Sequence, residues 1–105
     1  MPVLSTRLNP RGDDFKASAA AMRALVDDLN ARLAQVAQGG GEAARAKHVA
    51  RGKLLPRERV EMLLDPDTPF LEVAPLAGLD LYDNAAPGGG VIAGIGRIAG
   101  VECMV

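Results

Sequence analysis

A positively charged turn near the middle of the chain contains the residue types best suited to bind a charged ligand. Arg51 and Lys53 flank Gly52. A glycine can adopt a positive φ and lets the backbone come close to a ligand. The sequence therefore places a freely turning backbone between two cations, directly before a proline-started segment at Pro56.

Two other residues with reactive side chains lack partners at a useful spacing. His48 could act as a general base or a ligand, but no second histidine or cysteine lies at ligand spacing, so we predict a surface or capping role. Cys103 is the single cysteine, which excludes an internal disulfide framework and a cysteine zinc site. We predict no metal site and assign no catalytic residue.

Two glycine triplets, residues 39–41 and 88–90, could be mistaken for phosphate cradles. A cradle of that kind needs glycines between a strand and a helix. The first triplet follows a predicted helix and the second precedes a predicted strand. We interpret the first as a hinge and the second as part of a loop.

Composition limits the classes of function. The chain has 105 residues, a net charge of −1 and 3% aromatic residues. One small domain without a basic excess argues against nucleic acid as a partner. No stretch has the length needed to span a bilayer, and the N-terminus has no apolar run of signal-peptide length. We predict no membrane association and a cytoplasmic location.

The first 65 residues are expected to be an irregular arm, residues 1–12, followed by a helical region, residues 13–65. A helix should begin at Asp13, with an aspartate as its N-cap. Its apolar residues recur with the helical period. They are Phe15, Met22, Leu25, Val26, Leu29, Leu33 and Val36. We favour a stripe that docks on a partner or a larger body over an ordinary amphipathic helix, because the chain offers little core for it to cover.

Two further helices are predicted around the basic turn. One covers residues 42–50 and is rich in alanine. The other starts at Pro56 and stops at Asp65-Pro66, since a residue before proline is pushed out of the helical region. Val60, Leu63 and Leu64 should share one face of it.

Residues 66–105 are expected to be mainly strand and turn. Residues 70–73 are a short strand candidate, residues 76–82 are ambiguous, and residues 91–98 and 101–105 predict an antiparallel hairpin around Ala99-Gly100. Gly94 and Gly96 leave one strand face bare, which favours tight packing over close approach of a ligand. Because the chain stops within an apolar run, we expect further polypeptide to follow.

Several motifs resemble the carboxyltransferase subunits of biotin-dependent acyl-CoA carboxylases. They are Arg51-Gly-Lys-Leu-Leu-Pro-Arg-Glu-Arg59, Leu81-Tyr-Asp-Asn84 and the glycine series of residues 87–105. Within that family the motifs are most similar to the methylcrotonoyl-CoA carboxylase β group, and similar also to its geranyl-CoA counterpart. Propionyl- and acetyl-CoA relatives are less similar around Tyr82.

The resemblance implies a fold and an activity. The fold would be α/β, with N-terminal helices and a β-hairpin forming the opening part of a crotonase-like (ClpP/crotonase) carboxyltransferase domain, truncated within residues 66–105. The activity would be transfer of CO2 from carboxybiotin to 3-methylcrotonoyl-CoA in leucine degradation. The backbone N–H donors that stabilise the enolate in this family lie in glycine-rich turns beyond these motifs.

The resemblance also implies cofactors and partners. Biotin would be carried by a partner, the biotin carboxylase/biotin carrier (α) subunit, which also uses ATP and Mg²⁺. Further copies of the chain and an acyl-CoA substrate complete the expected partners. Arg51 and Lys53 would neutralise phosphates of CoA. The competing interpretation is that they pair with Glu58, Glu61 or helix ends. A non-catalytic interaction module of helices and hairpin is the alternative function.

Overall fold

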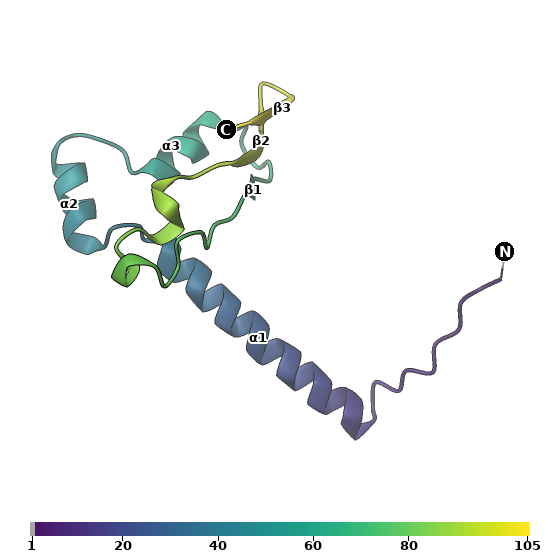
Figure 1. Ribbon diagram of the computed structural model, residues 1–105. Coiled ribbons are helices and arrows are strands. Elements are labelled where there is room, and N and C mark those ends of the chain that lie inside the picture. Colours follow the sequence, from purple (N-terminus) through teal and green to yellow (C-terminus); the bar gives the residue numbers. More distant parts are fainter. Residues whose placement is uncertain (1) are drawn as a thin grey trace. The chain divides into compact units, whose positions relative to one another are not determined.

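The computed structural model describes residues 2–105 and contains two compact units, which meet between Ala31 and Arg32. The first unit holds an extended arm and most of helix α1, Asp13–Ala37 (Figure 1). The predicted helix start at Asp13 is confirmed, but the predicted aspartate N-cap is wrong. Gly12 precedes the helix and its carbonyl accepts the Lys16 N–H at 3.1 Å. Asp13 and Asp14 instead occupy the first turn, where negative charge complements the helix dipole.

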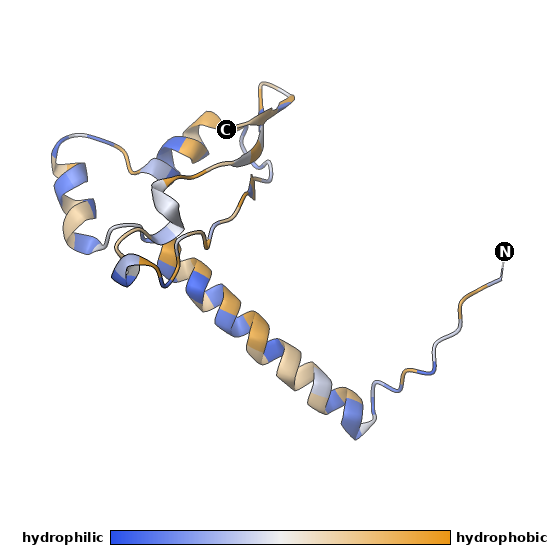
Figure 2. Ribbon diagram, in the orientation of Figure 1, coloured by the Kyte–Doolittle hydropathy of each residue, from blue (hydrophilic) through white to orange (hydrophobic). Residues whose placement is uncertain are grey.

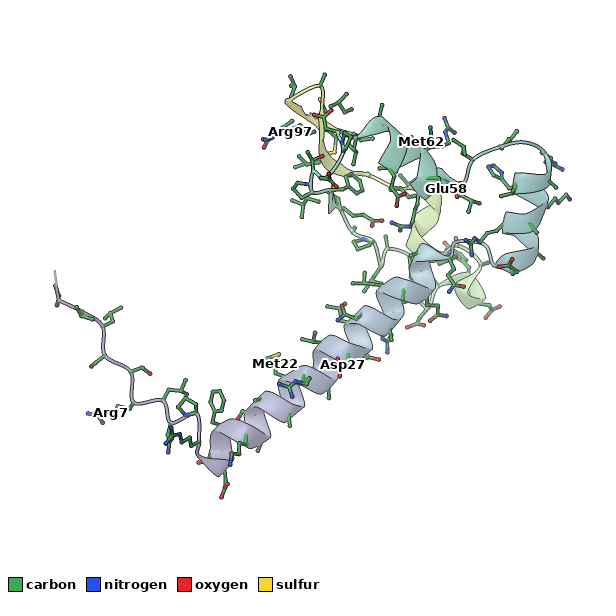
Figure 3. The ribbon with its side chains drawn as sticks, turned by 180° about the vertical axis from the view of Figure 1, so that it is seen from behind. Arg7, Met22, Asp27, Glu58, Met62 and Arg97 are labelled. Carbon is green, nitrogen blue, oxygen red and sulfur yellow. The ribbon has the colours of Figure 1, made fainter. Side chains whose placement is uncertain are left out.

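The predicted apolar stripe of α1 is largely exposed within its own unit. Met22, Leu25, Val26 and Leu29 each keep between 45% and 65% of their accessible surface. Apolar residues recur along the helix in Figure 2, and the Met22 side chain stands away from its backbone in Figure 3. Exposure of this extent is typical of a surface that another polypeptide covers.

The second unit begins with the last turns of α1 and continues through two short helices. Val36 is the single buried apolar residue among residues 2–105, with 4% of its surface exposed. Helix α1 ends at Ala37, and Gly39 follows with a φ of 66°, the left-handed conformation that commonly ends a helix. Helix α2 is Glu42–Ala50, the range that the sequence predicts.

Helix α3, Pro56–Leu63, starts at the predicted proline. Its first turn is closed by Glu58, whose carboxylate accepts the Leu55 N–H at 2.8 Å. The helix stops one residue before the predicted face is complete. Leu64 is extended, with a φ of −77° and a ψ of 152°, so it does not share a helical face with Val60.

A three-stranded antiparallel sheet follows, in the order β1-β2-β3. Strand β1 is Leu71–Glu72, β2 is Gly94–Ile98 and β3 is Val101–Met104. The predicted hairpin is confirmed, with Ile98 opposite Val101, although residues 91–93 stay outside the strand. The short strand predicted at residues 70–73 is two residues long and pairs with β2. Of the ambiguous residues 76–82, residues 76–81 form turns and a bend, and Tyr82 begins the short 3-10 helix η1, Tyr82–Asn84.

The bare face of β2 is filled by side chains from the preceding segment. Gly94 and Gly96 are both buried. A Cβ on Gly94 would meet the Phe70 ring and the Leu71 carbonyl at 2.5 Å, and one on Gly96 would meet the Leu64 side chain. The interpretation of these glycines as a tight packing surface is therefore confirmed.

A single carboxylate joins the end of α3 to the hairpin turn. The two oxygens of Asp65 accept the N–H groups of Ala99 and Gly100 at 2.7 and 2.8 Å. The Asp65 N–H donates to the Arg97 carbonyl at 2.8 Å. Ala99 and Gly100 have φ values of 50° and 79°, the left-handed pair that a two-residue hairpin turn requires. Asp65 therefore holds a turn in which a non-glycine residue adopts an unfavourable conformation.

Replacing Asp65 by asparagine should loosen this turn. Asparagine keeps the shape but replaces one acceptor oxygen by an amide donor, so one of the two turn N–H groups loses its acceptor. We expect amide exchange at Ala99 or Gly100 to rise about tenfold, which corresponds to about 1–1.5 kcal/mol. Hydrogen–deuterium exchange measures it. The matched control is Asp67→Asn, at a left-handed residue whose carboxylate does not accept the turn N–H groups. Equal exchange in both variants would contradict the assignment.

Candidate functional site

The basic turn lies between α2 and α3 and is shaped by the end of α2. The N–H groups of Arg51 and Gly52 donate to the carbonyls of His48 and Val49 at 3.2 and 2.9 Å. Gly52 has a φ of 74°, which confirms the predicted use of a glycine at this position. No heavy atom lies within 4 Å of the place where its Cβ would be, so the outer side of the turn is open.

Both predicted ligand residues are exposed on this turn. Arg51 and Lys53 point from a surface segment, and neither forms an ion pair with any residue of the described range 2–105. The carboxylate of Glu58, one of the competing partners, is engaged by the Leu55 N–H at the start of α3. Figure 3 shows Glu58 on α3, the helix that follows the turn. The arrangement leaves two cations available to an external anion.

The charge around the turn differs in sign from that of the whole chain. Residues 42–59 contain six lysines and arginines against two glutamates, while the chain as a whole carries −1. Two of these arginines are neutralised locally: Arg45 approaches Glu42 at 3.7 Å, and Arg57 pairs with Glu72. A surface of this kind attracts anions over distances set by the Debye length, about 8 Å at physiological ionic strength.

His48 lies at the base of the turn. Its Nε2–H donates to the Leu54 carbonyl, with 2.9 Å between nitrogen and oxygen. The ring is partly buried, and this bond spans the whole basic turn from the end of α2 to the residue before Leu55. The acceptor lies outside α2, so this bond closes the turn and does not cap the helix, and the predicted surface or capping role is not tested by it.

An open cleft of about 950 Å³ lies within the second unit, beside the turn. Its walls are mainly apolar and include the end of α1, parts of α2 and α3, and the loop of residues 85–92. His48 lines it, whereas Arg51 and Lys53 do not. The two predicted ligand residues therefore belong to the outer surface beside the cleft rather than to its walls.

Helix α3 is tied to the sheet by a two-pronged ion pair that the sequence did not indicate. The guanidinium of Arg57 donates from Nη1 and Nη2 to the two oxygens of Glu72, each at 2.9 Å. These hydrogen bonds raise the pKa of Arg57 above its ordinary value, partial burial opposes the rise, and the charge of Glu72 adds to it. A raised pKa means that the charged form of Arg57 is stabilised in the folded state, and this stabilisation is complete at any pH below the ordinary pKa of arginine. The Arg57 guanidinium therefore does not titrate near neutral pH.

The described residues show neither a metal cluster nor a membrane span. Within residues 2–105 no three side chains of His, Cys, Asp or Glu gather closely enough to hold a metal ion. None of the helices in the same range is long and apolar enough to cross a bilayer.

The chain belongs to the carboxyl transferase domain family, whose model matches residues 47–105. It is 58% identical over 83 residues to the biotin-dependent 3-methylcrotonyl-coenzyme A carboxylase beta1 subunit of Mycobacterium tuberculosis, covering 79% of this chain and 16% of that protein. The resemblance predicted from the basic turn and the glycine series is thereby confirmed.

Solved structures show the same relationship. The chain resembles the beta subunit of P. aeruginosa geranyl-CoA carboxylase with a TM-score of 0.64 and 42% identity, over 98% of this chain and 19% of that one. It resembles the transcarboxylase 12S core, a hexamer, with a TM-score of 0.70 and 33% identity, over 79% of this chain and 17% of that one. The chain thus spans less than one fifth of the relatives it matches.

Arg57 and Glu72 should determine how firmly α3 sits on the sheet. Arg57→Lys keeps the charge but removes the two-pronged geometry. We expect hydrogen–deuterium exchange in α3 and β1 to rise about three- to tenfold. The matched control is Arg45→Lys, where the exposed pair with Glu42 should change exchange by less than about twofold. Equal, small effects in both variants would show that the Arg57 pair does not fasten the helix.

Proposed function

We propose that the chain is the opening segment of the carboxyltransferase subunit of a biotin-dependent acyl-CoA carboxylase. In the complete subunit the reaction would be transfer of CO2 from carboxybiotin to 3-methylcrotonoyl-CoA, a step of leucine degradation. The observation that carries the proposal is family membership over residues 47–105, together with 58% identity to a 3-methylcrotonyl-CoA carboxylase beta1 subunit. The helices and small sheet would open a crotonase-like α/β domain.

The role proposed for this segment is to bind the phosphates of CoA. Arg51 and Lys53 support it because they are exposed, lack ion pairs within the described residues and flank an open, left-handed Gly52. An arginine fork and a lysine point charge are the usual partners of phosphate. No described residue is assigned a catalytic role, since the family's oxyanion donors would lie in glycine-rich turns elsewhere in the subunit.

The proposal includes partners and cofactors. Biotin would arrive on a biotin carboxylase/biotin carrier (α) subunit, which also uses ATP and Mg²⁺, and the described residues offer no arrangement that we assign to biotin. Other copies of the chain are proposed partners because the transcarboxylase relative assembles as a hexamer. A reducing, cytoplasmic setting agrees with the single cysteine.

Three alternatives have specific support. Geranyl-CoA as substrate is favoured by 42% identity over nearly the whole chain to a geranyl-CoA carboxylase beta subunit. A propionyl-CoA carboxylase equivalent has weaker support, from 33% identity over 86 residues to a putative propionyl-CoA carboxylase beta chain of Bacillus subtilis. A non-catalytic interaction module is favoured by the exposed stripe of α1.

An assay of carboxylation distinguishes these functions. The complete subunit, combined with its biotin-bearing partner, ATP, Mg²⁺ and labelled bicarbonate, should label 3-methylcrotonoyl-CoA more efficiently than geranyl- or propionyl-CoA. The 105-residue chain in place of the subunit should transfer no label, and the partner alone is the control. A preference for geranyl-CoA would select the first alternative. Transfer of label by the 105-residue chain in place of the subunit would refute the proposal that the catalytic groups lie elsewhere in the subunit.

The phosphate contact is tested by removing both cations. In the complete carboxylase, Arg51→Ala/Lys53→Ala should raise the KM for acyl-CoA about tenfold with kcat unchanged. The two charge-assisted contacts to phosphate would be the same in the ground state and the transition state, so their loss weakens binding and does not slow the chemical step. The control is Lys16→Ala/Arg23→Ala, which removes the same charge from exposed positions of α1. A KM equal to that of the unmodified enzyme would end the assignment of Arg51 and Lys53.

A further inference from the structure

We infer that His48 is a positioning residue for the basic turn: its side chain closes the turn so that Arg51 and Lys53 are held ready for phosphate. The inference rests on the proposed function of those two cations. It concerns a residue that touches the turn and not the ligand.

The first half of the turn is fixed by the backbone of α2. The N–H groups of Arg51 and Gly52 donate to carbonyls of the last helical turn, at 3.2 and 2.9 Å. Arg51 itself leaves the helix in the bridge region, with a φ of −85° and a ψ of 7°. The position of its Cα therefore follows from the helix.

The second half, from Lys53 to Leu54, is fixed by His48. The Leu54 carbonyl accepts the Nε2–H of His48 at 2.9 Å, six residues earlier in the chain. Beyond Leu54, the N–H of Leu55 is bound by Glu58 and α3 begins at Pro56. The His48 bond thus joins the end of one helix to the segment that leads into the next, with Lys53 between.

Closure of this kind lowers the cost of binding. A free segment between two helices loses backbone entropy when a ligand orders it, whereas a closed one has lost that entropy already. His48 is itself partly buried, and it lines the same cleft as Leu55 and Pro56. The ring can donate from Nε2 in either the neutral or the protonated state, so the bond needs no change of charge.

The test uses the complete carboxylase and two thioesters. One is acyl-CoA, and the other is the same acyl group on pantetheine, which carries no phosphate. His48→Ala should raise the KM for acyl-CoA about three- to tenfold without changing kcat, and should leave kcat/KM for acyl-pantetheine within twofold. His48→Gln, whose amide nitrogen reaches a position similar to Nε2, should restore the KM.

A second arm separates failure of this inference from failure of the proposed function. In the Arg51→Ala/Lys53→Ala background, His48→Ala should add no further rise in KM, because the positioned groups are gone. An unchanged KM in His48→Ala beside a raised KM in the double variant overturns the positioning role and leaves the proposed function intact. An unchanged KM in the double variant overturns both.

Other outcomes also decide. Three results would assign His48 a general structural or catalytic role instead. They are an equal fall in kcat/KM for acyl-CoA and acyl-pantetheine, a fall in kcat, or additive rises in KM when His48→Ala is combined with Arg51→Ala/Lys53→Ala. If His48→Ala fails to assemble, His48→Asn replaces it, because the shorter amide keeps polarity but does not reach the Leu54 carbonyl. Asparagine and glutamine variants with the same KM would then overturn the inference.

Discussion

The Asp65 carboxylate is the constraint on which the second unit depends. It holds the N–H groups of Ala99 and Gly100, while its own N–H binds the Arg97 carbonyl. Because Asp65 lies two residues after the end of α3, these bonds join the helix to the β2–β3 hairpin. The two-pronged Arg57–Glu72 pair ties the other end of the same helix to β1. Tight contact over Gly94 and Gly96 then fills the space between.

This anchoring matters for the basic turn, because the turn leads straight into α3. Because α3 is held in place, the turn that carries Arg51 and Lys53 needs few additional restraints on its backbone. These restraints are the hydrogen bonds to the end of α2 and the bond from His48. The cleft beside the turn is mainly apolar and contains His48 but not Arg51 or Lys53. Arg45, Arg59 and Glu61 are among the charged residues that line the cleft, so its mainly apolar walls also carry charge beside the two exposed cations.

Local features were predictable from the sequence, and long-range ones were not. Periodicity located α1, alanine content located α2, Pro56 located the start of α3, and Ala99-Gly100 located the hairpin turn. The pairing of β1 with β2 and the bonds of Asp65 and Arg57 join residues far apart in sequence, for which no local pattern exists. At the candidate site, residue types suggested Arg51 and Lys53, but only the structure shows that Glu58 is occupied elsewhere and that His48 binds Leu54. The family was recognisable because the order of residues, unlike composition, is specific.

The separation between Asp65 and its partners has a consequence for synthesis on the ribosome. Asp65 and Ala99 are 34 residues apart. At a translation rate of about 5–20 residues per second, Ala99 follows Asp65 by about 2–7 seconds. During that interval the end of α3 has no hairpin to bind, and Leu64 has no Gly96 to cover. The nascent chain therefore exposes the apolar residues of its helices before its sheet forms, which makes early binding by chaperones an advantage for this fold.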